Sequence, residues 1–195
     1  MLHPIGIPRP FRYIVRKAED KLKRLSIFFL FLTFLGFSAS YTSSEEHKIG
    51  ELKITSPVFD GDIPRRYTCD GKNISPPFEI KNVPPQAKSL ALIVDDLDAP
   101  RGTFVHWIIW NIDPAIREIK ENSVPKGAVQ GINDFKKHTY GGPCPPSRTH
   151  RYVFKLFALD VSLNLRPNST MVDLQNAMKS HVIGNAQLIG LYSRK

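Results

Sequence analysis

The sequence predicts a mostly β fold, a sandwich or barrel of short antiparallel strands. Beyond residue 50, short apolar segments rich in β-branched and aromatic residues recur, and residues typical of turns separate them. Only one stretch has the spacing of an amphipathic helix. The chain contains no internal repeat and no low-complexity tract. Together these features favour a layered β-domain.

Six segments are expected to form strands. In chain order they are ELKITS (51–56), SLALIVDD (89–96), FVHWIIWNI (104–112), GAVQGI (127–132), YVFKLFALD (152–160) and AQLIGLY (186–192). The segment 104–112 is apolar on both faces, which is typical of a strand in the middle of a covered sheet. In 152–160, side-chain alternation places Tyr152, Phe154 and Leu156 on one face.

One helix is expected near the C-terminus. Thr170 and Asp173 have the spacing of a capping box. The stripe that follows consists of Leu174, Ala177, Met178, His181 and Val182. Gly184 is the expected stop. We interpret His181 as a structural residue on this stripe.

Residues 1–40 predict export. An uncharged apolar run, LSIFFLFLTFLGF (25–37), follows several basic residues and precedes the small residues Ser38, Ala39 and Ser40. This order is typical of a secretory signal, and the run is short for a helix that spans a bilayer, which needs about 20 residues. Two outcomes remain open, cleavage after Ser40 or an uncleaved membrane anchor. Either places the protein outside the cytoplasm.

The rest of the chain is expected to be one domain, residues 51–195, after a flexible polar tether at 41–50. The full chain carries a formal charge of +9, but much of it lies in the export segment, and residues 41–195 carry only +4. No basic stripe with interleaved aromatic residues remains there, which argues against a nucleic-acid partner.

The domain contains two cysteines, Cys69 and Cys144. Outside the cytoplasm, such a pair indicates either one disulfide or two small buried thiols. Two sequons, at Asn73 and Asn168, are possible glycosylation sites in the same compartment. Pro76, shortly after the first, makes Asn73 the poorer acceptor.

The segment GGPCPPSRTHRY (141–152) combines a stiff loop with side chains suited to anions. Proline fixes φ and glycine reaches conformations closed to other residues, so residues 141–146 should form a rigid, irregular loop. If the following strand already begins at His150, then His150 and Tyr152 lie side by side at the edge of an apolar face. A polar pair in that place is typical of a small-ligand pocket.

A second histidine, His106, lies within the apolar strand at 104–112. A buried imidazole without a partner is costly, so His106 needs a hydrogen-bond partner. The carboxylates of Asp96 and Asp98 stand just upstream in DDLDAP (95–100), and we expect one of them to orient an imidazole.

Three motifs in this order resemble those of the phosphatidylethanolamine-binding protein family, also called Raf kinase inhibitor-like proteins, in its bacterial and archaeal branch. DDLDAP resembles the DPDAP signature, FVHWIIWNI the second block and GGPCPPSRTHRY the third. CDGKNISPPFEI (69–80) resembles a loop that lies near the pocket in that branch. The resemblance covers about residues 52 to 193.

This resemblance implies an antiparallel β-sandwich with one or two short peripheral helices and a small pocket for phosphate, acetate or a phospholipid headgroup. It implies that the pocket is lined by Asp96, Asp98, His106, Gly142, Pro143, His150 and Tyr152. The rigid loop would then form one wall. Two positions depart from the family pattern: Leu97 replaces the proline of DPDAP, and Arg148 stands where glycine is common.

The function expected is that of an exported, non-enzymatic protein that binds a small anion or phospholipid headgroup, with regulation of a partner protein left open. A serine-protease inhibitor is the first alternative. A hydrolytic site, with Ser147 or Cys144 beside His150, and a metal site at the pocket carboxylates and histidines are lesser ones. No metal and no cofactor is expected. The sequence is compatible with a monomer or a homodimer.

Overall fold

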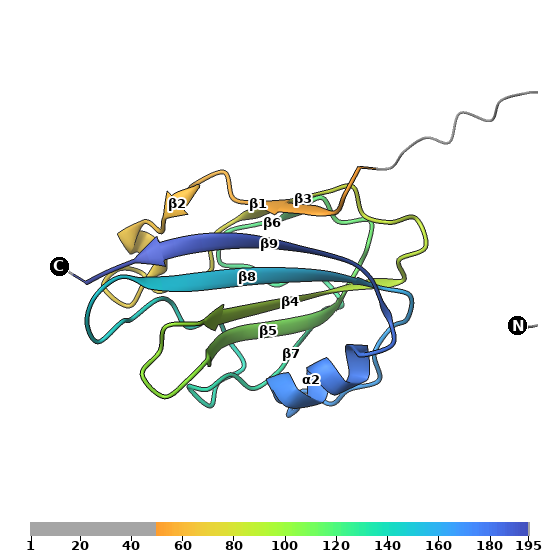
Figure 1. Ribbon diagram of the computed structural model, residues 1–195. Coiled ribbons are helices and arrows are strands. Elements are labelled where there is room, and N and C mark those ends of the chain that lie inside the picture. The colour runs from red at the N-terminus through yellow and green to blue at the C-terminus, as the bar shows by residue number, and fades with distance from the viewer. Residues whose placement is uncertain (1–49, 195) are drawn as a thin grey trace, which may run out of the picture. The chain divides into compact units, whose positions relative to one another are not determined.

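The computed structural model describes residues 50–194, and the expectations for the export segment and nearly all of the tether lie outside the described residues. Within the described part, no helix has the length and apolarity needed to cross a bilayer. Two sheets and one α-helix make up the domain (Figure 1). The expected sheet-dominated fold with a short peripheral helix is confirmed.

The larger sheet has six strands. In spatial order they are β2 (Gly61–Asp62), β9 (Val182–Tyr192), β8 (His150–Leu159), β4 (Ser89–Asp96), β5 (Phe104–Ile112) and β7 (Val129–Gln130). All neighbours are antiparallel except β2 and β9, which run parallel. The smaller sheet consists of β1 (Lys53–Thr55), β3 (Phe78–Lys81) and β6 (Glu118–Ile119).

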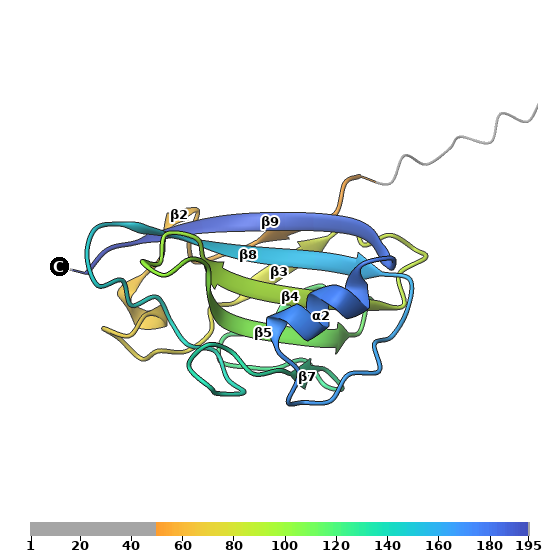
Figure 2. The same ribbon diagram turned by 60° about the horizontal axis from the view of Figure 1, so that its bottom comes forward.

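Hydrophobic side chains cover both faces of the larger sheet. On one face, β3 brings Phe78 against Phe154 of β8, with ring centroids 5.2 Å apart. Helix α2 (Met171–Met178) lies against the other face (Figure 2). There Leu174 packs in a cluster with Ile93 and Trp110. Full burial of one such side chain contributes about 1.5–3 kcal/mol, so these clusters hold the central strands β4, β5 and β8 rigid.

Each of the six expected segments contains a strand, and two of these strands have the expected bounds. β4 and β5 match 89–96 and 104–112 because continuous apolar runs end at clear turn residues. β8 begins at His150, and β9 begins at Val182, four residues before the expected 186. β2, β3 and β6 were not predicted. They have two to four residues each, too few to show a periodicity.

The helix differs from the prediction at its end. Its capping box is present, because Thr170 accepts a hydrogen bond from the Asp173 amide while the Asp173 carboxylate accepts one from Thr170 N. However, α2 ends at Met178, and Val182 and Gly184 belong to β9 instead. Pairing with β8 outweighs the helical spacing of residues 181–182, because it satisfies a whole row of backbone groups. His181 lies in the turn between α2 and β9 and bonds to Asp160.

Candidate functional site

The predicted site residues meet at one end of the larger sheet, where β4 finishes and where β5 and β8 begin. β4 finishes at Asp96, which lies opposite Phe104 at the start of β5 and opposite Tyr152 near the start of β8. The C-terminal end of β9 lies at the same end of the sheet, because Tyr192 pairs with His150 (Figure 1). Antiparallel pairing thus gathers segments from widely separated parts of the chain, around residues 96, 150 and 192.

His150 and Asp96 form a buried pair in this site. Nδ1 of His150 lies 2.7 Å from Oδ2 of Asp96, and both side chains are 6% exposed. The other carboxylate oxygen, Oδ1, accepts a hydrogen bond of 2.8 Å from the Asp98 amide. Both oxygens of Asp96 are therefore engaged, and the carboxylate fixes the orientation of the His150 ring.

His106 is oriented by the backbone. Its Nδ1 donates to the carbonyl oxygen of Gly141 at 2.7 Å, so the upstream carboxylate that orients an imidazole, Asp96, does so at His150 and not at His106. The reason is tertiary: the loop after residue 133 folds back over β5 and presents that carbonyl. Phe104 and Phe135 pack around the ring edge-on. Burial lowers the pKa of His106, which favours a neutral imidazole in the free protein.

Tyr152 lies between the two histidines. Its ring centroid is 5.2 Å from that of His106 and 6.5 Å from that of His150. The hydroxyl is buried, with the Asp96 carboxylate and the Cys144 backbone nearby, but it makes no hydrogen bond of good geometry with any of the described residues. Burial, with the Asp96 carboxylate nearby, raises the pKa of Tyr152, so the hydroxyl keeps its proton and can donate it to a ligand.

Asp98 pairs with Arg151 and makes no hydrogen bond with either histidine. Its carboxylate binds the Arg151 guanidinium through both oxygens, at 2.7 and 2.9 Å, and also accepts the Arg151 amide at 2.8 Å. These bonds hold the pKa of Asp98 well below its usual range. The pair closes the edge of the site, where the Asp98 side chain remains 29% exposed.

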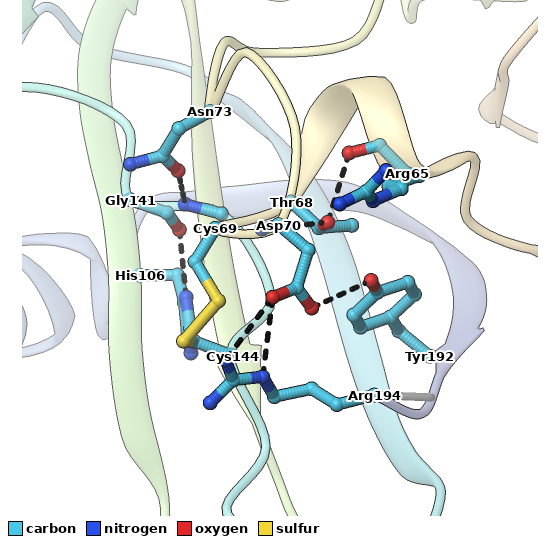
Figure 3. The surroundings of a disulfide bond; sticks show 11 residues. Arg65, Thr68, Cys69, Asp70, Asn73, His106, Gly141, Cys144, Tyr192 and Arg194 are labelled. Carbon is cyan, nitrogen blue, oxygen red and sulfur yellow. Dashed lines mark hydrogen bonds and ion pairs between the residues drawn. A yellow bond between two sulfur atoms is a disulfide. The ribbon is translucent and has the colours of Figure 1, made fainter.

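The loop at residues 141–144 forms a wall beside His106 and is tied to the loop at 67–73 (Figure 3). Cys69 and Cys144 form a disulfide. Gly142 N donates to Asn73 Oδ1 at 2.7 Å, and the carbonyl of the buried Pro143 accepts from Cys69 N at 3.0 Å. A side chain at Gly142 would collide with backbone atoms of the facing loop, which explains the glycine.

The wall also borders a cleft of about 390 Å³. Gly141, Gly142 and Cys144 line it, together with Asn73 and Trp107, but neither histidine does. Within residues 50–194, the His, Cys, Asp and Glu side chains form no group of three or more that could hold a metal ion.

Comparison with known proteins identifies the family of this domain. The family model "Phosphatidylethanolamine-binding protein" matches residues 54–193. The chain belongs to the phosphatidylethanolamine-binding protein family. Among curated relatives, a UPF0098 protein of Methanothermobacter thermautotrophicus is 53% identical over 139 residues, which are 69% of this chain and 92% of the relative. One from Pyrococcus abyssi is 47% identical over 156 residues, 74% of this chain and 87% of that protein.

Two solved structures share this family fold. A phosphatidylethanolamine-binding protein homologue from Chlamydia trachomatis is 39% identical, with a TM-score of 0.72, and is covered over 99% of its length by 74% of this chain. Escherichia coli YbcL, described as a member of the mammalian family, is 29% identical, with a TM-score of 0.71 and coverage of 75% and 100%. The domain described here therefore corresponds to essentially the whole of both solved chains.

Sequence reasoning missed several residues that shape this site of the family fold. Gly141 orients His106 through its carbonyl, Phe104 and Phe135 enclose the ring, and Asn73 braces the wall. Asn73 had been singled out only as a glycosylation site. Its left-handed backbone, with φ of 56°, is common for asparagine in turns, but no sequence signal shows that its side chain reaches residue 142.

Proposed function

We propose that this protein binds a small anion, a phosphate or carboxylate group or the phosphate of a lipid headgroup, without catalysing a reaction. The observation that carries the proposal is the Tyr152 hydroxyl, buried without a partner between two oriented histidines. Leaving a buried hydroxyl unbonded costs about 1–3 kcal/mol. A ligand oxygen at this place would satisfy it.

The partners of the two imidazoles decide which nitrogen meets the ligand. The Gly141 carbonyl and the Asp96 carboxylate can only accept hydrogen bonds, so Nδ1 of each ring carries a hydrogen. The second nitrogen, Nε2, is left for a ligand. In a neutral ring Nε2 has a lone pair, and only the protonated ring offers an N–H to an anion. An N–H from Nε2 of His106, whose lowered pKa leaves the ring neutral in the free protein, therefore reaches an anion only after the ring takes up a proton.

This requirement predicts that anion affinity falls as pH rises. Burial lowers the pKa of His106, against the opposing effect of Asp95 and Asp96, so the free ring is neutral near neutral pH. The anion binds the protonated ring. If binding takes up one proton, the association constant falls about tenfold for each pH unit above the histidine pKa. Isothermal titration calorimetry with sulfate, which does not itself titrate in this range, measures the effect.

The same calorimetry in two buffers of different ionisation heat counts the protons taken up on binding. We expect net uptake at neutral pH. Sulfate affinity that stays constant across the histidine range, or binding without proton uptake, would contradict the role given to the histidines. A total lack of binding to sulfate, phosphate and acetate would remove the proposed function itself.

We also propose that the domain acts outside the cytoplasm. The disulfide supports this, because such bonds persist in oxidising compartments. N-terminal sequencing of the natively expressed protein should find Tyr41 as the first residue, or the whole chain should stay in the membrane fraction. An intact chain beginning at Met1 in the soluble cytosolic fraction would argue against export.

A further inference from the structure

Two carboxamide side chains that line the cleft beside the wall have a fixed orientation. Oδ1 of Asn73 accepts the Gly142 amide at 2.7 Å, and Oε1 of Gln130 accepts the indole N–H of Trp107 at 2.8 Å. A backbone or indole N–H can only donate, so in each carboxamide the oxygen is engaged and the NH2 group is left over. In Figure 3 the oxygen of the Asn73 amide faces the wall, and its nitrogen points away from the disulfide.

The fold holds both carboxamides in place. Gln130 of β7 pairs with Ile109 of β5, so its side chain lies on the same face of the sheet as Trp107, two residues earlier in β5. Asn73 reaches the cleft from the loop at 67–73, which the disulfide ties to the wall. Donors that are held before a ligand arrives lose little conformational entropy on binding, which favours affinity.

The rest of the cleft lining suits a neutral ligand. Ser75 is only 4% exposed, and its hydroxyl makes no hydrogen bond with the residues that the structure describes. Val124 and Phe135 also line the cleft and are 39% and 38% exposed. Among the lining residues only Lys137 carries a charge, and because this residue is exposed its charge stays solvated. The lining thus offers fixed donors, one free hydroxyl and apolar side chains, without a buried charge.

We propose that this cleft binds a neutral ligand through an acylamide group, the C(=O)–NH unit. A carbonyl oxygen accepts hydrogen bonds and donates none, which matches the NH2 groups of Asn73 and Gln130. The Ser75 hydroxyl can accept the N–H of the ligand, and the acyl carbon chain can pack against Val124 and Phe135. A plain hydroxyl group fits less well, because it brings a donor with each acceptor while both carboxamide oxygens are already engaged.

This site is separate from the proposed anion site. None of Asp96, His150 and Tyr152 lines the cleft, and the proposal does not depend on anion binding. The cleft volume of about 390 Å³ lies within the range of small-molecule sites. Acylamide groups occur both in N-acetylated sugars and in peptides, so the test uses a small probe of each kind.

The test is a nuclear magnetic resonance titration of residues 41–195, the domain that corresponds to 99% of the Chlamydia trachomatis chain. The indole N–H of Trp107 reports on the cleft through its bond to Gln130. The chain has one other tryptophan, Trp110, which packs in the cluster on the opposite face and serves as the internal reference. The probes are N-acetylglucosamine and N-acetylalanine methylamide, with glucose as the sugar that lacks the acylamide.

We expect at least one acylamide probe to shift the Trp107 indole signal saturably in the millimolar range, and glucose to leave it unchanged. The probe that binds identifies the source of the group, and binding of both shows that the acylamide alone is recognised. No saturable shift with either acylamide, or an equal shift with glucose, would overturn the proposal.

Two isosteric variants test the donors. Asn73→Asp and Gln130→Glu keep the oxygens that accept from Gly142 and Trp107 but replace each NH2 group with a second acceptor. Each should weaken binding of the acylamide about tenfold. Gln187→Glu, the same change at an exposed side chain of β9 outside the cleft, should bind as wild type does. The spectra show whether each variant is folded, and if one unfolds the other decides. Undiminished binding in a folded Asn73→Asp or Gln130→Glu protein would refute the role of these donors.

Discussion

Replacing both Cys69 and Cys144 with serine is expected to lower the free energy of unfolding by roughly 4 kcal/mol. The disulfide links residues 75 positions apart, and closing so long a loop removes much conformational freedom from the unfolded chain. It also joins the wall of the candidate site to the facing loop. Its loss should therefore loosen the Gly141 carbonyl that orients His106 and weaken anion binding as well.

Urea unfolding of wild type and the double serine variant, both without reductant, measures the difference. Thiol titration of the unfolded, unreduced wild type provides the control, and it should detect no free thiol. Two titratable thiols would show that the natural protein lacks the bond. Equal unfolding free energies for the two proteins would show that the bond adds no stability.

Replacing His150 with alanine should weaken anion binding by about 1.5 to 3 kcal/mol, or roughly 10- to 150-fold. The variant loses one charged donor to the anion and leaves the Asp96 carboxylate without its buried partner. His106→Ala should have an effect of similar size, because it removes the second donor. Calorimetry with phosphate and phosphoethanolamine compares these variants with wild type.

His181→Ala is the matched control for this experiment. His181 also forms a histidine–carboxylate pair, with Asp160 at 2.8 Å, but it precedes β9 at the end remote from the site. This variant should bind phosphate as wild type does. If removing His106 or His150 has no more effect than removing His181, the two histidines form a structural polar cluster and the anion site must lie elsewhere.

The parts of the fold that could be predicted are those where the chain itself shows the pattern. β4 and β5 are long apolar runs that end at turn residues, and Thr170 with Asp173 marks the start of α2. The end of α2 could not be predicted. Helical spacing continues through residue 182, and only the presence of β8 shows that this segment pairs as a strand.

The same distinction holds for the site. The ordered motifs predicted that Asp96, His106, His150 and Tyr152 would lie together, and the structure places them in one cluster. They did not predict which partner orients which imidazole. That depends on how the 133–144 loop lies along β5, to which Asp134 N and Gly141 N bond, and no local pattern in the chain indicates this.

The residue types of the site and the strands that carry them could be read from the chain alone, because hydrophobic runs, turn residues and ordered motifs are local properties. The hydrogen-bond partners of the site residues depend instead on which remote segments pack together, and the fold alone reveals them. Arg148 shows the difference at a single residue. The sequence indicates a departure from a common glycine, and the structure supplies the reason for that glycine, a left-handed backbone with φ of 59°.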